Sequence, residues 1–233
     1  MSLNGSHNDG AGANLNETTA KSLETTAIDY IKDRDRIRIA FCGSAGTGKT
    51  TTMEEINKIL ELPVVGEGVR EWMADNKITH LRELSARDTM RLQMEIMRNK
   101  GGKEKTLQRF IADRTMLDAA AYCMYWLGRE NEMQRGIQQY LTDCMAHTIQ
   151  NYDYIFLFPY GAIPLEDDGI RSAKPVYQMM IQFLIEYLIQ KAMIYSPNTI
   201  VHAVRSVSLE DRVNEILTVL YTTKPGSVPS PEE

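Results

Sequence analysis

One stretch of this chain, Arg36 to Met53, restricts the folds it can adopt more than any other, and it reads RIRIAFCGSAGTGKTTTM. An apolar, β-rich run, Ile37 to Cys42, leads directly into GSAGTGKT, and a helix-compatible segment follows. GSAGTGKT has the spacing G-x-x-x-x-G-K-[ST] of a phosphate-binding loop between a strand and a helix. Glycines let backbone N–H groups turn toward phosphate oxygens, and the helix points the positive end of its dipole at them. The stretch therefore predicts a nucleotide site.

The residue types within this loop suggest separate roles. We expect Lys49 to reach the β- and γ-phosphates and the Thr50 hydroxyl to ligate Mg²⁺, so ATP and Mg²⁺ are the predicted cofactors. The alternative is a flexible Gly/Ser/Thr connector. Such a connector would have no reason to match every fixed position of the motif and to lie between a strand and a helix. The residues expected to enclose the triphosphate are Gly43, Ser44, Ala45, Gly46, Thr47, Gly48, Lys49, Thr50 and Thr51.

Length and charge narrow the class of protein. With 233 residues, the chain is long enough for one α/β domain with a substantial core and short for two. We expect a disordered, polar tail over residues 1–20, one domain over residues 21–222, and a second polar tail over residues 223–233. The net charge of -5 gives no overall basic footprint of the kind that binders of duplex DNA show. Nucleic acid is therefore not the favoured partner, although a local basic groove would be compatible with it.

Cysteines and apolar runs indicate the compartment. Cys42, Cys123 and Cys144 form an odd, widely spaced set within apolar or helical sequence, which predicts reduced thiols in the core of a cytoplasmic protein. No stretch approaches the roughly eighteen consecutive apolar residues of a membrane-spanning helix, and the polar start of the chain lacks the apolar region of a signal peptide. We therefore expect no membrane partner.

A second group of candidate residues follows the next predicted strand, Leu62 to Val65. In a doubly wound sheet, ligands bind beyond the carboxyl ends of the strands, so Glu67 and Arg70 are expected beside a second substrate. Trp72 and Tyr122 are expected to help shape its pocket, although for Trp72 a place in the core is the favoured interpretation. The alternative for the charged pair is a solvated helix start, in which Glu67 favours the helix dipole and Arg70 is merely exposed.

The strand predicted over Phe110 to Thr115 approaches its end at an acidic residue, Asp113. A carboxylate at this place holds Mg²⁺, directly or through water, in phosphate-loop enzymes. Asp113 is equally suited to cap the N-terminus of the helix predicted from about Thr115 to Leu127, and the two roles can coexist. The other candidate strand, Tyr154 to Phe158, has no acid at its end.

A long loop, Pro159 to Ser172, separates that strand from a helix predicted from about Pro175 to Met193. Such a loop is a suitable place for a mobile active-site lid, where Arg171 would compensate charge during phosphoryl transfer. The alternative is a solvated acidic run in which Arg171 pairs with neighbouring carboxylates, a contact worth about 0 to 1 kcal/mol.

Helical and strand periodicity predict the remaining elements. A helix from Ser85 to Lys100 is expected to end at Gly101-Gly102. A helix from Asn131 to Gln150 carries His147, which we expect at the surface or its boundary. The other predicted elements are a helix from Thr51 to Leu60, a strand from Thr199 to Val204 and a terminal helix opened by Ser208.

Five strands that alternate with helices, parallel by the right-handed crossover rule, predict a three-layer α/β/α P-loop NTPase fold with a five-stranded, mainly parallel sheet. The glycine-rich loop, Glu-x-x-Arg, Asp-Arg-Thr, YDYIFLF and DGIRS, in this order, resemble the AAA_28 group of phosphate-loop kinases. The resemblance spans Arg36 to Leu220, and DGIRS, at residues 168–172, is its narrower marker. That group includes the ribosylnicotinamide-kinase domain of bacterial NAD-biosynthesis regulators and many phage kinases.

Deoxynucleoside kinases show a comparable layout. There, Glu67 matches a base at a strand end, and Asp113-Arg114-Thr115 matches an acid-Arg-Ser triplet with Asp and Thr substituted. The implied activity is ATP-dependent transfer of the γ-phosphoryl group to a nucleoside-like or nucleotide acceptor.

This reaction assigns a role to each candidate residue. Lys49, Arg114 and Arg171 would surround the moving phosphoryl group, and Thr50 with Asp113 would hold Mg²⁺. Acceptor contacts would come from Glu67, which orients or deprotonates a hydroxyl, and from Arg70, which holds a polar or phosphate group.

Other functions stay open at this point. A relative of the phage type would phosphorylate a hydroxymethylated base in DNA, which the acidic balance mildly disfavours. An NTP-hydrolysing switch or sensor would need a water-orienting residue and loops that respond to the γ-phosphate, and the sequence offers no clear candidate for the former. An ATP-dependent ligase would be recognised by its products.

Overall fold

The computed structural model describes residues 28–81, 84–162 and 174–226. At its centre lies β1 (Ile37–Cys42), which pairs with β3 (Arg109–Asp113) on one side and β4 (Tyr154–Leu157) on the other. The edge strands are β2 (Val64–Val65) and β5 (Ile200–Ala203), which gives the order β2-β3-β1-β4-β5. Every pair is parallel, so the prediction of five strands is confirmed and the described sheet is wholly parallel rather than mainly so.

The sequence of β1 explains its central place. Its residues are buried throughout, and successive side chains point to opposite faces of the strand. Ile37, Ile39 and Phe41 join one core cluster, whereas Ala40 and Cys42 join the other. A strand with apolar side chains on both faces is what a parallel sheet covered on both sides requires.

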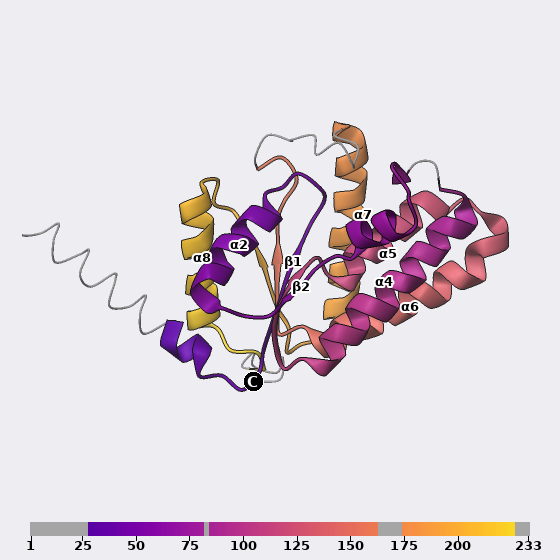
Figure 1. Cartoon of the computed structure of the whole chain (residues 1–233). Helices are drawn as coiled ribbons and strands as arrows, with labels where there is room; N and C mark the ends of the chain where they lie inside the picture. The colour runs from indigo at the N-terminus through magenta and orange to yellow at the C-terminus, as the bar shows by residue number, and fades with distance from the viewer. Residues whose placement is uncertain (1–27, 82–83, 163–173, 227–233) are drawn as a thin grey trace, which may run out of the picture.

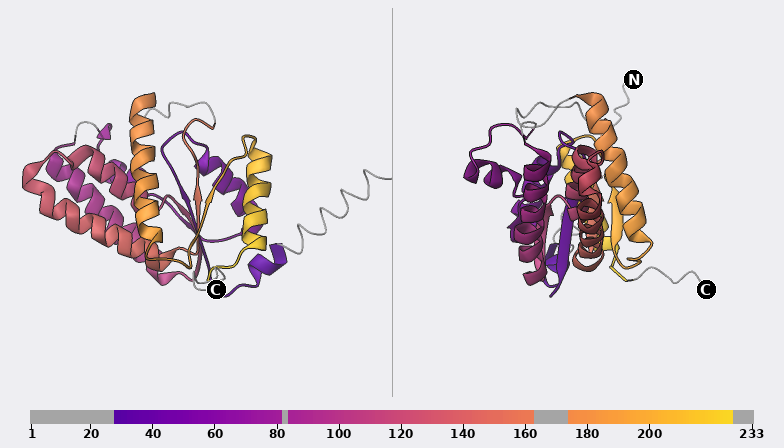
Figure 2. Two further views of the ribbon diagram at one scale, coloured as in Figure 1. Left: turned by 180° about the vertical axis from the view of Figure 1, so that it is seen from behind. Right: turned by 90° about the vertical axis from the view of Figure 1, so that its right-hand side faces the viewer.

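Helices cover both faces of this sheet (Figure 1). One layer packs against the cluster that contains Ile37, and the larger layer packs against the cluster that contains Cys42. The view from behind shows the same three layers, which confirms the predicted three-layer fold (Figure 2). The smaller layer consists of α2 (Lys49–Leu60) and α8 (Leu209–Thr222), and the larger of α4 (Ala86–Thr106), α5 (Met116–Leu127), α6 (Gln134–Asn151) and α7 (Pro175–Met193). The described residues also include short α3 (Val69–Asp75), the 3-10 turn η2 (Asn131–Met133) and a helical segment over residues 28–32.

α4 is longer than predicted, because the pair Gly101-Gly102 lies inside it. Glycine within a helix costs only about 1 kcal/mol relative to alanine. Contacts across and beyond the pair offset this cost, since Lys100 Nζ lies 2.7 Å from Glu104 Oε1 and both side chains are buried. Gly101 also leaves room for His147 of α6, whose Cε1 would lie 3.4 Å from an added Cβ. The prediction that this helix ends at its glycines is therefore wrong.

His147 is buried, so its predicted place at the surface or its boundary is wrong as well. Its Nε2 lies 2.6 Å from Glu104 Oε2, and the Tyr152 hydroxyl donates to the same oxygen at 2.8 Å. Burial alone would raise the pKa of Glu104, but the charge of Lys100 and the bond from His147 hold that pKa below its ordinary value. A buried polar cluster thus joins α4 to α6, and hydrophobic periodicity gives no sign of it.

The three cysteines are free and buried, as expected. Burial raises the pKa of the Cys42 thiol well above its ordinary value and that of Cys123 to about 12. Among the helices of the described ranges, none combines the length and apolar character needed to cross a membrane. The tail predicted over residues 1–20 lies outside the described residues, and the domain limits at 21–222 and the cytoplasmic location stay predictions.

Candidate nucleotide and acceptor site

The phosphate loop connects β1 to α2 in a conformation that its glycines permit. Gly43, Gly46 and Gly48 have φ angles of 134°, 75° and 78°, in a region that side chains disfavour. At Gly43 the space is closed as well, because an added Cβ would lie 2.5 Å from the Phe158 carbonyl oxygen. The glycine spacing of the motif therefore follows from the backbone path of the loop.

Lys49, the first residue of α2, folds back over the loop. Its side chain is buried, and its Nζ donates to the Ser44 carbonyl oxygen and, at 3.0 Å, to Thr47 Oγ1. The N–H of Thr52 donates to the Gly48 carbonyl at 3.1 Å and closes the first turn. The positive end of the α2 dipole therefore lies at the loop, where it favours an anion. The geometry is therefore suited to a bound phosphate.

Thr50 and Asp113 meet at the edge where β1 and β3 end. Register places Asp113 opposite Phe41, and Thr50 Oγ1 lies 3.3 Å from Asp113 Oδ2. A hydroxyl and a carboxylate are hard oxygen ligands of the kind that Mg²⁺ takes together with water and phosphate oxygens. These two residues therefore fit the predicted metal site.

The alternative role for Asp113, capping of α5, is wrong. The cap is Thr115, whose Oγ1 accepts from the Asp118 N–H at 3.2 Å while Asp118 Oδ2 accepts from the Thr115 N–H at 2.8 Å. Such a reciprocal arrangement is a capping box, and the spacing T-x-x-D in the sequence would have revealed it. The Asp113 carboxylate is instead in contact with Thr50.

Arg114 organises the buried polar contacts of the site. Its φ of 72° is unusual for a residue with a side chain. Its guanidinium lies 3.1 Å from Glu67 and 3.3 Å from Asp118, and it donates to the Gly43 carbonyl at 3.0 Å. It also lies over the ring of Tyr122. One cation thus connects the turn after β2, the phosphate loop and α5.

The electrostatics around Arg114 favour its charged form. Burial alone would lower the pKa of this guanidinium, but Glu67, Tyr122 and Asp118 together raise the pKa well above its ordinary value. Arg114 is only 3% exposed, so its charge acts on these neighbours rather than on solvent. Arg114 is therefore suited to hold the phosphate loop and Glu67 together.

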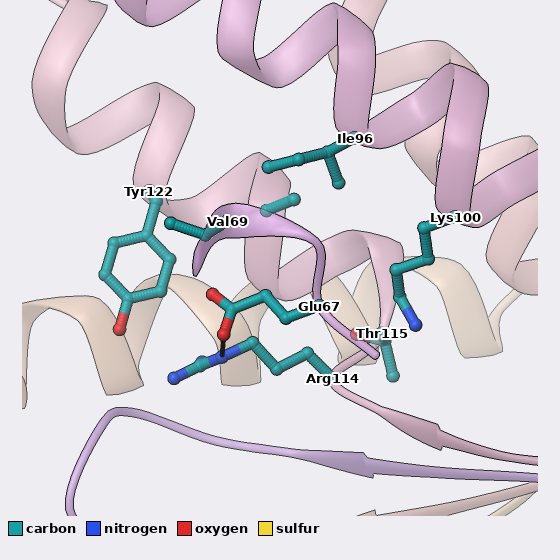
Figure 3. Close-up of a pocket in the computed structure, with 8 residues that line it drawn as sticks. Glu67, Val69, Ile96, Lys100, Arg114, Thr115 and Tyr122 are labelled. Carbon is teal, nitrogen blue, oxygen red and sulfur yellow. Dashed lines mark ion pairs between the residues drawn. The ribbon is translucent and has the colours of Figure 1, made fainter. Parts of the chain in front are cut away.

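Glu67 and Arg114 line a small cavity between the turn after β2, α4 and α5 (Figure 3). Tyr122 and Val69 lie near the carboxylate, and Lys100 enters from α4 on the opposite side. The cavity measures about 30 Å³. A space of this size holds about two water molecules, so binding of a nucleoside there requires the lining to move.

Two other predicted acceptor residues, Trp72 and Arg70, do not line the cavity beside Glu67. Trp72 is buried on α3, in agreement with its core interpretation, and it also lines a second cavity of about 170 Å³, which shares Lys100 with the first. Arg70 is exposed on the same helix, outside both cavity linings. Arg171 and the DGIRS marker fall outside the described residues.

Three residues that sequence reasoning missed hold the start of the phosphate loop. Asp118 Oδ1 accepts from the Gly43 N–H at 3.0 Å. Gln182 Oε1 accepts from the Ser44 N–H at 2.9 Å, and Gln178 Oε1 accepts from the Ala45 N–H at 3.0 Å. In the sequence, the two glutamines are marked by their four-residue spacing within a largely apolar stretch of α7.

Comparisons with solved structures agree with this fold. Deoxyadenosine kinase from M. mycoides with bound dATP has a TM-score of 0.57 and 16% identity, and the match covers 79% of this chain and 99% of that one. The NadR protein in complex with NAD and AMP-PNP also has a TM-score of 0.57 and 16% identity, and the match covers 96% of this chain and 61% of that one. This chain thus matches less than two thirds of the length of NadR.

The sequence comparisons give a family. A search of curated proteins finds no match for this chain. The AAA_28 model, described as an AAA domain, matches residues 38–212, which is more than half of the chain and includes every site residue discussed above. The resemblance predicted from the sequence is confirmed, and the chain belongs to the AAA_28 family.

Proposed function

We propose that this chain is an ATP-dependent kinase that transfers the γ-phosphoryl group to a hydroxyl, or a phosphate, of a nucleoside-like or nucleotide acceptor. One observation carries the proposal. The Arg114 guanidinium contacts both the Gly43 carbonyl of the phosphate loop and the carboxylate of Glu67. A nucleotide site and an acid suited to an acceptor hydroxyl therefore adjoin. The similar folds of a deoxyadenosine kinase bound to dATP and of NadR bound to AMP-PNP support a nucleotide-dependent reaction.

Phosphoryl transfer asks the protein chiefly for alignment and charge neutralisation. Lys49 would bind the β- and γ-phosphates, and the amides of residues 46–51 would surround them. Thr50 and Asp113 would hold Mg²⁺, which neutralises charge on the phosphate oxygens when it is bound. Arg171, which lies outside the described residues, would add positive charge in the transition state.

Glu67 would orient or deprotonate the acceptor hydroxyl. One of its oxygens lies 3.1 Å from Arg114 Nε, and a carboxylate oxygen can accept a hydrogen bond from such a hydroxyl. Arg70 would hold a phosphate of a nucleotide acceptor, and Trp72 and Tyr122 would shape the pocket. Arg114 would act mainly by holding Glu67 and the loop together, because its side chain is engaged by protein groups on several sides.

The test is a coupled assay of ADP release with ATP and Mg²⁺ against nucleosides, nucleoside monophosphates and hydroxymethylated DNA. We expect release to depend on an acceptor of the first two classes, with mass spectrometry showing a product one phosphoryl group heavier. Turnover only with DNA would identify the acceptor as a base within nucleic acid. Equal turnover without any acceptor would contradict the kinase proposal and favour an NTP-hydrolysing switch.

A further inference from the structure

The two peptide groups that open the phosphate loop are each held at both ends. The first joins Gly43 to Ser44: its carbonyl accepts from Arg114 and its N–H donates to Gln182. The second joins Ser44 to Ala45: its carbonyl accepts from Lys49 and its N–H donates to Gln178.

A peptide group is planar, with its N–H and its carbonyl pointing in opposite directions. Fixing the N–H therefore fixes the direction of the carbonyl. Gln182 sets the carbonyl on which Arg114 depends, and Gln178 sets the carbonyl on which Lys49 depends.

The two glutamines are well placed for this task. They are 2% exposed each and lie one turn apart on α7, so their side chains share a face of the helix. Gln182 is itself oriented, because its Nε2 donates to Glu186 Oε1 at 2.8 Å and leaves Oε1 for the loop. A buried backbone N–H needs an acceptor, and no apolar side chain could supply one.

We infer that Gln178 and Gln182 are positioning residues for nucleotide binding, which hold the first two peptide groups of the phosphate loop in the orientation that Lys49 and Arg114 require. The inference rests on the proposed nucleotide site and extends it from the loop to α7. Within the loop, the N–H groups of residues 43–45 are held by Asp118, Gln182 and Gln178 in turn.

The first test replaces each glutamine by leucine, which has a similar size and no acceptor. Gln190→Leu is the matched control, because Gln190 is an exposed residue of the same helix. Calorimetric titration with AMP-PNP and Mg²⁺ should give dissociation constants about five- to tenfold higher for Gln178→Leu and Gln182→Leu, and an unchanged value for Gln190→Leu. Folded leucine variants that bind as tightly as the unmodified chain would overturn the inference.

A second measurement separates positioning from general stability. Amide hydrogen exchange of the nucleotide-free chain should show protection at Ser44 and Ala45. Gln178→Leu should remove that protection at Ala45, and Gln178→Glu should retain it because a carboxyl oxygen accepts the same bond. Unprotected amides in the unmodified chain would overturn the inference without any variant. Failure of the unmodified chain to bind AMP-PNP would instead contradict the proposed function, and the exchange result would still decide the positioning role.

Discussion

At the scale of single residues, loss of the Lys49 side chain should lower the rate of ADP release strongly. Its ammonium is already held over the phosphate loop by the Ser44 carbonyl and Thr47, so little reorganisation is needed when a triphosphate arrives. Lys49→Ala should lower ADP release by at least about a hundredfold, the usual cost of removing a preorganised charge or donor. Lys58→Ala, at an exposed position of the same helix, is the control. A loss smaller than tenfold would show that Lys49 does not contact the transferred group.

A substitution at Glu67 should distinguish a hydroxyl acceptor from a phosphate acceptor. Glu67→Gln removes the negative charge but keeps the shape, so transfer to a hydroxyl should fall by about a hundredfold or more while AMP-PNP binds nearly as before. The measurement is kcat with the acceptor found in the screen, beside a titration with AMP-PNP. Glu54→Gln, exposed on α2, controls for a general change of charge. Unchanged transfer by Glu67→Gln would remove this residue from the mechanism and favour a phosphate acceptor, which needs no base.

Residues that belong to a local sequence motif were easier to predict than residues defined by contacts between distant parts of the chain. Lys49 and Thr50 belong to a motif whose glycines set a particular backbone path, so their place beside the loop was predictable from the spacing. Asp113 was located by its place at a strand end, and its contact with Thr50 supports that reasoning. Gln178 and Gln182 lie far along the chain from the amides they bind, so their four-residue spacing marks a shared helix face but does not identify the partner on it.

At the scale of elements, the continuation of α4 through two glycines gives a prediction about stability. Gly102 is exposed within the helix, and an added Cβ would meet nothing within 4 Å. Gly102→Ala should therefore raise the free energy of unfolding by about 1 kcal/mol, measured by urea titration. Gly128→Ala is the contrasting variant, because its Cβ would lie 2.5 Å from the Met124 carbonyl and should destabilise the chain. A lower stability for Gly102→Ala would contradict the helical assignment at this point.

The elements also show where periodicity succeeds and where it fails. Strands β1 and β4 and helix α7 were predicted within a residue or so, because apolar runs and a leading Pro175 mark them clearly. The predicted end of α4 came too early, because the low helix propensity of glycine takes no account of contacts with distant residues. The contacts that carry the helix onward, from Glu104 to His147 and Tyr152, join segments more than forty residues apart.

At the scale of the whole molecule, the site depends on strands that are adjacent in the sheet but not in the chain. β1 lies between β3 and β4, so the phosphate loop after β1 is beside the Asp113 end of β3. α8 packs beside α2 in the smaller helical layer, and Arg212 of α8 lies 3.5 Å from the Gly48 carbonyl oxygen. The geometry at the loop is therefore supported by the smaller layer as well as by α5 and α7.

The junction between β5 and α8 should make stability depend on pH. Glu215 of α8 lies 2.7 Å from His202 Nε2 and accepts from the N–H groups of Arg205 and Ser206 at 3.0 and 2.9 Å. Burial alone would raise the pKa of Glu215, but these hydrogen bonds hold it at about 2, below its ordinary value of 4.5. A depressed carboxyl pKa contributes stability that is present above the unfolded value and is lost as the pH falls toward the folded value.

Urea unfolding at pH 5 and at pH 3 measures this contribution. Since the folded pKa is the lower one, the chain should lose stability between these pH values, and Glu215→Gln should lose less, by about 1 kcal/mol once screening by solvent is allowed for. Glu210→Gln, exposed on the same helix, should keep the pH dependence of the unmodified chain. The change should appear in the unfolding of the entire domain, because α8 and α2 share one core cluster with β1. Equal pH dependence of Glu215→Gln and the unmodified chain would show that this junction does not couple to global stability.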